Sequence, residues 1–362
     1  MKRFHNISAL VILCAASLLA QVPKVVSPEV SGDKTATFRV YAPKAEKVLL
    51  LGDWLKQGAQ HEMTKGADGV WTTKAGPFPP GAFIYGFEID GLQLPDPSNA
   101  SVKLRADRVG SLVHIPGDAV WAARDVPHGN VDINFHKSAA LGDTRWMFVY
   151  TPASYEKQRN KTYPVLYLLH GNNDTAAGWT MVGNANYILD NLIAEAKAQE
   201  MIVVMPFGHA APYGAPGGNN TQQFTEYLLK DVIPMIEGKY RVKTGAENRA
   251  LVGLSMGGGQ AINIGFSNLD KFSVIGSFSG AIPGDFETHF ASELADSASV
   301  NKKLALLWIG CGKDDFLHER NQQFSALLKS KGIEHTLEIT EGVHNYEAWR
   351  RYLASIAPLL FQ

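Results

Sequence analysis

Residues 250–260 read Ala250-Leu251-Val252-Gly253-Leu254-Ser255-Met256-Gly257-Gly258-Gly259-Gln260, an apolar run that leads into a Gly-x-Ser-x-Gly pattern. A helix-compatible segment of small and apolar residues follows over 261–266. A strand, a tight turn and a helix are what a nucleophile elbow needs, and the two glycines remove side chains that would collide there. The pattern predicts a nucleophile at Ser255, with the main-chain N–H of Met256 directed at a substrate carbonyl oxygen. A Ser/Gly turn without a catalytic role is the alternative.

From about residue 127 to the C-terminus, strand-like apolar segments alternate with segments of helical pattern. Strands are expected at 131–135, 145–150, 165–169, 201–205, before Ser255, and at 272–278, 304–309 and 336–339; helices are expected at 187–199, 222–239, 321–331 and from about 346. Such alternation is typical of a mostly parallel sheet that helices cover on both faces. The sequence therefore predicts an α/β domain over residues 127–362.

The preceding part of the chain has a different pattern. Short strand-like segments at 35–41, 47–51, 69–73 and 82–89 are separated by Gly and Pro, and Asp90-Gly91 suits a hairpin turn. Strands of this length and spacing indicate a small all-β sandwich over residues 25–118. Residues 119–126 are then the linker between the two domains.

The N-terminus has the features of a secretory signal. Lys2 and Arg3 precede an apolar segment over 7–19, and nearby alanines offer a cleavage site. The apolar segment is too short to span a membrane comfortably. We predict a signal peptide over residues 1–20, a secreted or periplasmic product and no membrane span, with lipid attachment at Cys14 as the lesser alternative.

The overall composition is that of an ordinary globular protein. The chain has 362 residues, of which 45% are hydrophobic and 19% charged, and its formal net charge is −1. Its length suggests two domains. Because there is no basic excess, neither nucleic acid nor an anionic membrane surface is an expected partner. The sequence leaves the oligomeric state open.

A serine nucleophile needs a base, and an acid that orients the base. In α/β-hydrolases the acid and then the histidine follow the serine, on loops after later strands. The loop after strand 304–309 carries Asp314 and Asp315, and the loop after strand 336–339 carries His344. We predict His344 as the general base and Asp315 as the orienting acid, with Asp314 as the alternative.

The segment His170-Gly171-Asn172 follows strand 165–169, where hydrolases place a second oxyanion donor. The main-chain N–H of Asn172 would pair with that of Met256, and each such donor lowers the reaction barrier by on the order of 3 kcal/mol. His170 itself is expected to brace this loop.

The α/β domain resembles the esterase D-like α/β-hydrolases, and more closely the feruloyl and acetyl-xylan esterases of carbohydrate esterase family 1. The matching segments are 163–171 (YPVLYLLHG), 205–209 (MPFGH), 231–237 (DVIPMIE), 253–258 (GLSMGG), 310–312 (GCG) with Asp315, and His344 with Trp349-Arg350. The family's Gly-x-x-Asp loop favours Asp315 over Asp314. One departure is Glu341-Gly342-Val343-His344, where many relatives have Gly-Gly-His, so the local loop shape is expected to differ.

The first domain resembles the early-set immunoglobulin-like domains of carbohydrate-binding module family 48. The matching segments are 38–43 (FRVYAP), 48–54 (VLLLGDW), 69–71 (GVW), 83–87 (FIYGF) and 94–97 (LPDP). Trp54, Trp71 and Tyr85 could stack on sugar rings if they are exposed. The alternative, which we favour, is that these aromatic side chains fill the core of the sandwich or its interface with the next domain.

Together the resemblances imply a serine esterase, without cofactor or metal, that releases ferulate (hydroxycinnamate) from plant cell-wall xylan or arabinoxylan. Residues that could line a pocket for an aromatic acid are Trp179, Phe207, His209, Tyr213 and Trp349. Three alternatives remain: an acetyl-xylan esterase, an esterase of enterochelin-type siderophores, and a carbohydrate-binding protein whose hydrolase domain is inactive.

Overall fold

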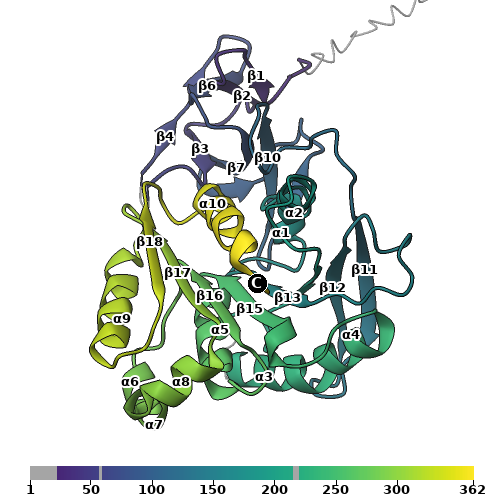
Figure 1. Cartoon of the computed structure of the whole chain (residues 1–362). Helices are drawn as coiled ribbons and strands as arrows, with labels where there is room; N and C mark the ends of the chain where they lie inside the picture. The colour runs from purple at the N-terminus through teal and green to yellow at the C-terminus, as the bar shows by residue number, and fades with distance from the viewer. Residues whose placement is uncertain (1–22, 57–58, 215–219) are drawn as a thin grey trace, which may run out of the picture.

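The computed structural model describes residues 23–56, 59–214 and 220–362. Figure 1 shows a smaller β domain stacked on one side of a larger domain that has a central sheet between layers of helices. The signal peptide predicted at residues 1–20 lies outside the described residues. Within the described part of the chain, no helix combines the length and the apolar character needed to cross a membrane.

The N-terminal domain is a sandwich of two antiparallel sheets. One sheet has the order β1 (Glu29–Val30), β2 (Ala36–Tyr41), β6 (Val70–Ala75), β5 (Thr64–Lys65); the other has β4 (His61–Glu62), β3 (Val48–Gly52), β7 (Gly81–Ile89), β10 (Val109–Ile115), β9 (Val102–Leu104), with β8 (Leu92–Leu94) also on β7. The predicted Asp90-Gly91 hairpin joins β7 to β8, and both turn residues have positive φ, 47° and 86°.

The aromatic side chains of this domain lie in its core. Trp71 is 7% exposed and Tyr85 is 2% exposed. The ring of the half-buried Trp54 packs against Phe38 and Phe78, with centroids 5.8 and 4.8 Å away. Trp71 and Tyr85 therefore stabilise the sandwich core, as the favoured alternative predicted.

The second domain is built on an eight-stranded sheet. Its order is β11 (Asn130–Lys137), β12 (Thr144–Thr151), β14 (Ile202–Pro206), β13 (Val165–Leu169), β15 (Arg249–Leu254), β16 (Val274–Phe278), β17 (Leu306–Gly312), β18 (Thr336–Thr340). The strands from β14 to β18 are parallel, whereas β11 and β12 pair antiparallel at one edge. The predicted fold class, an α/β-hydrolase after a β-sandwich, is confirmed.

Helices cover both faces of this sheet (Figure 1) because the central strands are apolar on both sides. Along β13, Leu166 and Leu168 pack on one helical layer, whereas Val165 and Tyr167 pack on the other. The first layer contains α1 (Gly178–Met181), α2 (Ala185–Ala194), α10 (Tyr346–Ile356) and a 3₁₀ turn (Ala357–Leu359); the second contains α3 (Asn220–Tyr227), α4 (Ile233–Lys239), α5 (Met256–Ser267), α6 (Phe286–His289), α7 (Ala291–Ala295), α8 (Ser297–Lys303) and α9 (His318–Ser330). A 3₁₀ turn (Ala246–Asn248) precedes β15.

The single helix predicted over 222–239 is instead interrupted. A π-helical turn, Leu228–Val232, separates α3 from α4. Pro234 follows at the start of α4 and has no N–H to donate to the carbonyl of Lys230, four residues earlier. Widening the helix before the proline accommodates that lost hydrogen bond.

The two domains are joined by buried polar contacts as well as by the chain. Within the predicted linker, the indole N–H of Trp121 donates to the carbonyl of Pro80 at 2.9 Å. The Arg350 side chain on α10 is fully buried, and its Nη1 donates to the carbonyls of Ala82 and Val182, both at 2.9 Å. One arginine thus links β7 of the sandwich to the end of α1.

We expect Arg350→Ala to lower the free energy of unfolding by about 3 kcal/mol, because it leaves a cavity and two buried carbonyls without donors. The neighbouring Arg351 is a matched control, since it is part-exposed and pairs with Glu347 on the same helix, so Arg351→Ala should cost less than about 1 kcal/mol. Urea unfolding followed by circular dichroism measures both values. Equal losses in the two variants would contradict the linking role of Arg350.

Candidate active site

Ser255 lies in the sharp turn between β15 and α5, as the pattern predicted. Its backbone has φ 52° and ψ −116°, a conformation that is unusual for a residue with a side chain and stores strain. The Ser255 N–H donates to the carbonyl of Phe278 at 2.8 Å, and its carbonyl accepts from the N–H of Ala281 at 2.9 Å. The end of β16 and the loop after it therefore hold the strained turn.

The flanking glycines are required by close backbone approaches. A Cβ on Gly253 would lie 2.3 Å from the carbonyl oxygen of Gly257, and a Cβ on Gly257 would lie 2.5 Å from that of His170. Any side chain at either position would push the turn apart. The Gly-x-Ser-x-Gly spacing thus follows from the packing of this turn.

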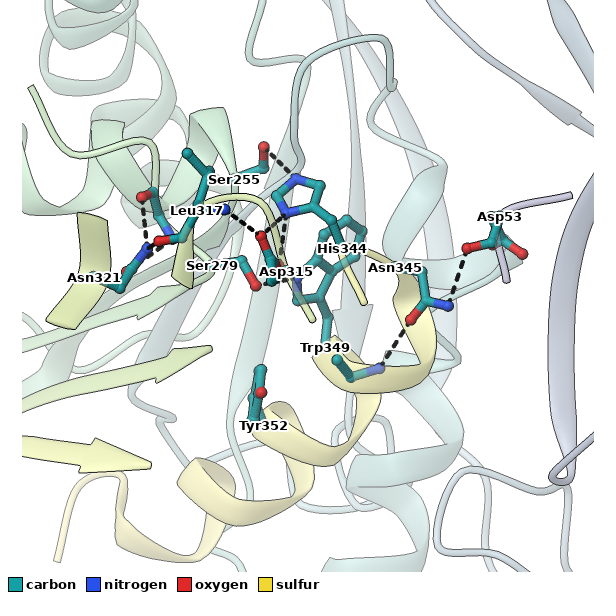
Figure 2. A network of polar contacts seen from close by, with 12 residues as sticks. Asp53, Ser255, Ser279, Asp315, Leu317, Asn321, His344, Asn345, Trp349 and Tyr352 are labelled. Atoms are coloured by element: carbon teal, nitrogen blue, oxygen red, sulfur yellow. Dashed lines mark hydrogen bonds and ion pairs between the residues drawn. The ribbon is translucent and has the colours of Figure 1, made fainter. Parts of the chain in front are cut away.

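His344 and Asp315 continue a chain of hydrogen bonds from the serine (Figure 2). His344 Nε2 lies 2.9 Å from Ser255 Oγ, and His344 Nδ1 lies 2.8 and 3.0 Å from the two carboxylate oxygens of Asp315. The three groups come from three loops that follow β15, β17 and β18. The arrangement can carry a proton from the hydroxyl to the imidazole while the carboxylate holds the ring.

The structure brings Asp315 to the histidine and places Asp314 elsewhere. The Asp315 side chain has no exposed surface, and its Oδ1 also accepts from the N–H of Leu317 at 2.8 Å. Burial alone raises the pKa of Asp315, but the hydrogen bonds from His344 and Leu317 outweigh it and hold that pKa below its usual range. Asp314 is instead part-exposed and forms an ion pair with Lys56 of the sandwich at 2.8 Å.

A buried asparagine connects the loop that supports Ser255 to the loop that carries Asp315. Asn321 on α9 is fully buried; its Oδ1 accepts from the N–H of Gly280 at 3.2 Å. Its Nδ2 donates to the carbonyls of Gly280 at 3.1 Å and Leu317 at 2.9 Å. The loop that holds Ser255 and the loop that carries Asp315 are thus fixed to one side chain (Figure 2).

Two aromatic rings flank the His344 imidazole. The Trp349 ring stands perpendicular to it at 4.9 Å between centroids, and its indole N–H donates to Ser279 Oγ at 3.1 Å. Phe316, next to Asp315, lies 4.4 Å from the imidazole and is 61% exposed. The exposed ring of Phe316 is therefore available to a bound molecule.

The segment predicted to supply the second oxyanion donor approaches Ser255 closely. A Cβ on Gly171 would lie 2.7 Å from Leu254 Cδ1 and 3.1 Å from Ser255 Cβ, so the absence of a side chain lets this loop lie close against Ser255. The next residue, Asn172, is exposed and lines the same cavity as Ser255. Met256 is the first residue of α5, where a helix leaves its N–H groups without an internal acceptor.

His170 braces this loop, as expected from the sequence. Its Nδ1 lies 2.8 Å from the carbonyl of Gly171, and its Nε2 accepts from the N–H of Gly208 at 2.8 Å. Burial lowers the pKa of His170 to about 4. The neutral ring, with its proton on Nδ1, satisfies both contacts.

Both domains line the cavity above Ser255, which has a volume of about 290 Å³. The sandwich contributes Asp53, Ile84, Lys103 and Arg105. Burial raises the pKa of Asp53 to about 6, against the opposing effects of a backbone hydrogen bond at Ile84 and of nearby cationic side chains. A larger cavity of about 450 Å³ lies on the sandwich and shares three of these residues, but it contains no nucleophile. Among the described residues, no group of three or more His, Cys, Asp or Glu side chains is placed to hold a metal.

Of the five aromatic residues predicted to bind substrate, Trp349 lines this cavity. The prediction for Trp179 is wrong: its side chain is fully buried in the core, and its indole N–H donates to the carbonyl of Leu169 at 2.9 Å. Phe207, His209 and Tyr213 do not line the cavity either. They form a row of rings beside the loop that follows β13. Phe207 lies 5.6 Å from the His170 ring, His209 lies next to Phe207, and Tyr213 at the other end is hydrogen-bonded to Asn173.

Sequence reasoning missed Phe316 and the four cavity residues of the sandwich. Phe316 could have been found, because it directly follows Asp315, the residue predicted as the orienting acid. Asp53, Ile84, Lys103 and Arg105 carry no local signal, since only the packing of the two domains brings them to the serine.

Two family models match the chain. Residues 138–360 match the family described as "Putative esterase", and residues 26–107 match carbohydrate-binding module 48, the isoamylase N-terminal domain. An endo-1,4-β-xylanase/feruloyl esterase of Xylanibacter ruminicola is 32% identical over 346 residues, which cover 92% of this chain and 46% of that protein. The chain therefore spans slightly less than half the length of that relative.

Solved structures give the same assignment of fold. A CE1 ferulic acid esterase from Anaeromyces mucronatus has a TM-score of 0.60 and 25% identity, over 68% of this chain and 96% of that one. The enterobactin esterase of Shigella flexneri has a TM-score of 0.65 at 15% identity, over 90% of this chain and 92% of that one, a likeness of fold alone. On these matches, the chain belongs to the "Putative esterase" family, as an α/β-hydrolase preceded by a module 48 sandwich.

Proposed function

We propose that the chain is a serine esterase that hydrolyses ferulate and related hydroxycinnamate esters carried by xylan or arabinoxylan. The observation that carries this proposal is the hydrogen-bonded series Ser255–His344–Asp315 at the base of a cavity with an exposed aromatic ring, Phe316, beside the imidazole. The xylanase/feruloyl esterase relative and the ferulic acid esterase structure support the choice of acyl group.

In the proposed reaction, Ser255 Oγ attacks the ester carbonyl while His344 Nε2 accepts the hydroxyl proton. Asp315 accepts the proton of His344 Nδ1 in a hydrogen bond, which fixes the tautomer of the ring and stabilises the imidazolium. The buried carboxylate stays ionised because its hydrogen bonds lower its pKa. His344 then donates its proton to the leaving sugar oxygen, and the acyl group remains on Ser255.

The main-chain N–H groups of Met256 and Asn172 hold the oxyanion of the tetrahedral intermediate. In the second half of the cycle, a water loses its proton to His344 and attacks the acyl-enzyme. Collapse of the second tetrahedral intermediate returns the proton to Ser255 and releases the free acid. No cofactor is required for these steps.

The size and lining of the cavity favour an aromatic acyl group. Its volume of about 290 Å³ lies near the lower limit of small-molecule sites, roughly 300 Å³, and exceeds what an acetyl group alone would fill.

We also propose that the substrate is an extracellular polysaccharide and that residues 1–20 export the chain.

Acetyl-xylan and enterochelin-type siderophore esters remain the alternative substrates. An acetyl esterase of Caldicellulosiruptor saccharolyticus is 22% identical over 62% of this chain and 95% of its own. A carbohydrate-binding protein with an inactive hydrolase domain is disfavoured, because the serine, histidine and acid lie within hydrogen-bonding distance in series.

The first test compares kcat/KM on 4-nitrophenyl ferulate and on 4-nitrophenyl acetate, which share one leaving group, and we expect a clear preference for ferulate. Ser255→Ala and His344→Ala should each lower kcat by about 10³-fold or more, because both groups act in the chemical step. Efficient turnover of acetate alone would reassign the acyl group. Activity that survives Ser255→Ala would overturn the esterase proposal.

The choice of acid is tested by two isosteric variants. Asp315→Asn should lower kcat by on the order of 10³- to 10⁴-fold, since an amide cannot hold the productive tautomer of His344. Asp314→Asn removes only a part-exposed ion pair to Lys56 and should stay within a few-fold of wild type. The opposite pattern would make Asp314 the orienting acid.

The role of the exposed ring is tested by Phe316→Ala. The ratio of kcat/KM on ferulate to that on acetate should fall by about 2- to 10-fold, the effect of losing one aromatic contact. Phe135→Ala is the matched control, because Phe135 is 71% exposed on the edge strand β11. An unchanged ratio in Phe316→Ala would place the aromatic acid elsewhere.

A further inference from the structure

A fully buried ion pair crosses the boundary between the two domains beside the active site. Lys103, on β9 of the sandwich, places Nζ 2.7 Å from Oδ2 of Asp174 in the hydrolase domain, and the two side chains are 2% and 7% exposed. Burial raises the pKa of Asp174, but the neighbouring Lys103 ammonium outweighs it and holds that pKa below its usual range. Burial also lowers the pKa of Lys103, and the attraction of Asp174 opposes that shift, so each side chain of the pair depends on a partner from the other domain.

Asp174 lies in the loop between β13 and α1, which also carries the proposed oxyanion donor. It follows Asn172 by two residues, and Asn173 between them has φ 61°, so the loop turns sharply there. The sandwich also holds this loop through its backbone: the N–H of Ala106 donates to the carbonyl of Asn173 at 3.2 Å. The sandwich therefore holds this loop at Asn173 and Asp174, the two residues that follow Asn172.

The same carboxylate is bonded to the loop of the histidine. The hydroxyl of Tyr346 donates to Asp174 Oδ2 at 2.7 Å, and the Lys103 ammonium lies 4.9 Å from the centre of the Tyr346 ring. Tyr346 begins α10 two residues after His344. One buried cluster, Lys103–Asp174–Tyr346, therefore connects the oxyanion loop to the general base.

The cluster is closely packed and leaves little freedom of movement. A Cβ on Gly178 would lie 2.4 Å from the Tyr346 hydroxyl and 2.5 Å from Asp174 Oδ2. A buried ion pair gives little net stability compared with apolar side chains of similar volume, because desolvation offsets the attraction. Its defined geometry is the property that an apolar replacement would lose.

We propose that Lys103 of the sandwich domain is a positioning residue for the oxyanion hole, and that it acts through its ion pair with Asp174 to hold the N–H of Asn172 against Ser255. This inference rests on the proposed function of Ser255 and Asn172. It makes the sandwich a working part of the hydrolytic site, in addition to any affinity for sugar.

The test compares Lys103→Met, the double variant Lys103→Met/Asp174→Asn and Tyr346→Phe with wild type, at a temperature where circular dichroism shows each to be folded. The double variant removes both charges and so avoids the unpaired carboxylate that Lys103→Met leaves. Tyr346→Phe removes one hydroxyl at constant ring volume, and it provides the measurement if neither charge variant folds. Lys74→Met is the control, since Lys74 is exposed and pairs with Asp33 on the same domain.

Two rates are measured. One is the rate of ester hydrolysis, and the other is the rate at which a small alkyl fluorophosphonate phosphonylates Ser255. The phosphoryl oxygen of that reagent needs the same N–H donors, those of Met256 and Asn172, as the oxyanion of the ester. We expect the charge variants to lose about 10-fold or more in kcat and in phosphonylation rate, with KM within about 2-fold, because a displaced donor acts in the transition state. Tyr346→Phe should lose less, and Lys74→Met should match wild type.

Folded cluster variants with wild-type kcat and phosphonylation rate would overturn the proposal, as would a loss confined to KM or to thermal stability. A wild-type protein that is phosphonylated but hydrolyses neither ester would refute the proposed substrates. The phosphonylation rates of the variants would then still test the role of Lys103. A wild-type Ser255 that resists the fluorophosphonate would overturn both proposals.

Discussion

The strained backbone at Ser255 is the constraint on which the rest of the site depends. A residue with φ 52° and ψ −116° keeps this conformation only if its neighbours over-determine it. The support comes from Phe278 and Ala281, which bond the Ser255 main chain on both sides. Asn321 then fixes the adjoining loop to the one that bears Asp315. A single turn thus dictates the placement of elements that are far away in the sequence.

Much of this arrangement could be predicted from sequence because parallel strands end at a common edge. Leu254 pairs with Phe278, and Gly312 pairs with Thr340. The residues that follow these strand ends must therefore lie close together, so the order of serine, acid and histidine along the chain already indicates the cluster. The alternation of strands and helices likewise predicts a parallel sheet covered by helices, and this pattern was sufficient to predict the fold class.

Other features could not be predicted, because they depend on contacts between distant parts of the chain. Tryptophan is a residue type that often lines ligand pockets. The position of Trp179 between the sheet and α10 nevertheless buries its side chain completely. The π-helical turn before Pro234 has the same apolar pattern as an ordinary helix. Asp53 and Arg105 lie in a different domain from the serine, so no spacing in the sequence relates them to it.

The join between the domains fixes where the sandwich lies relative to the hydrolase domain. The carbonyls of Val120 and Ala122 both accept from the Asn191 side chain, at 2.7 and 2.8 Å, and Trp121 is bonded to the sandwich. The segment is therefore a fixed connection, unlike a flexible tether, which would let a binding module sample many distances. The surface of the sandwich is consequently held at a set distance from Ser255, so a molecule that enters the cavity meets side chains of both domains at once.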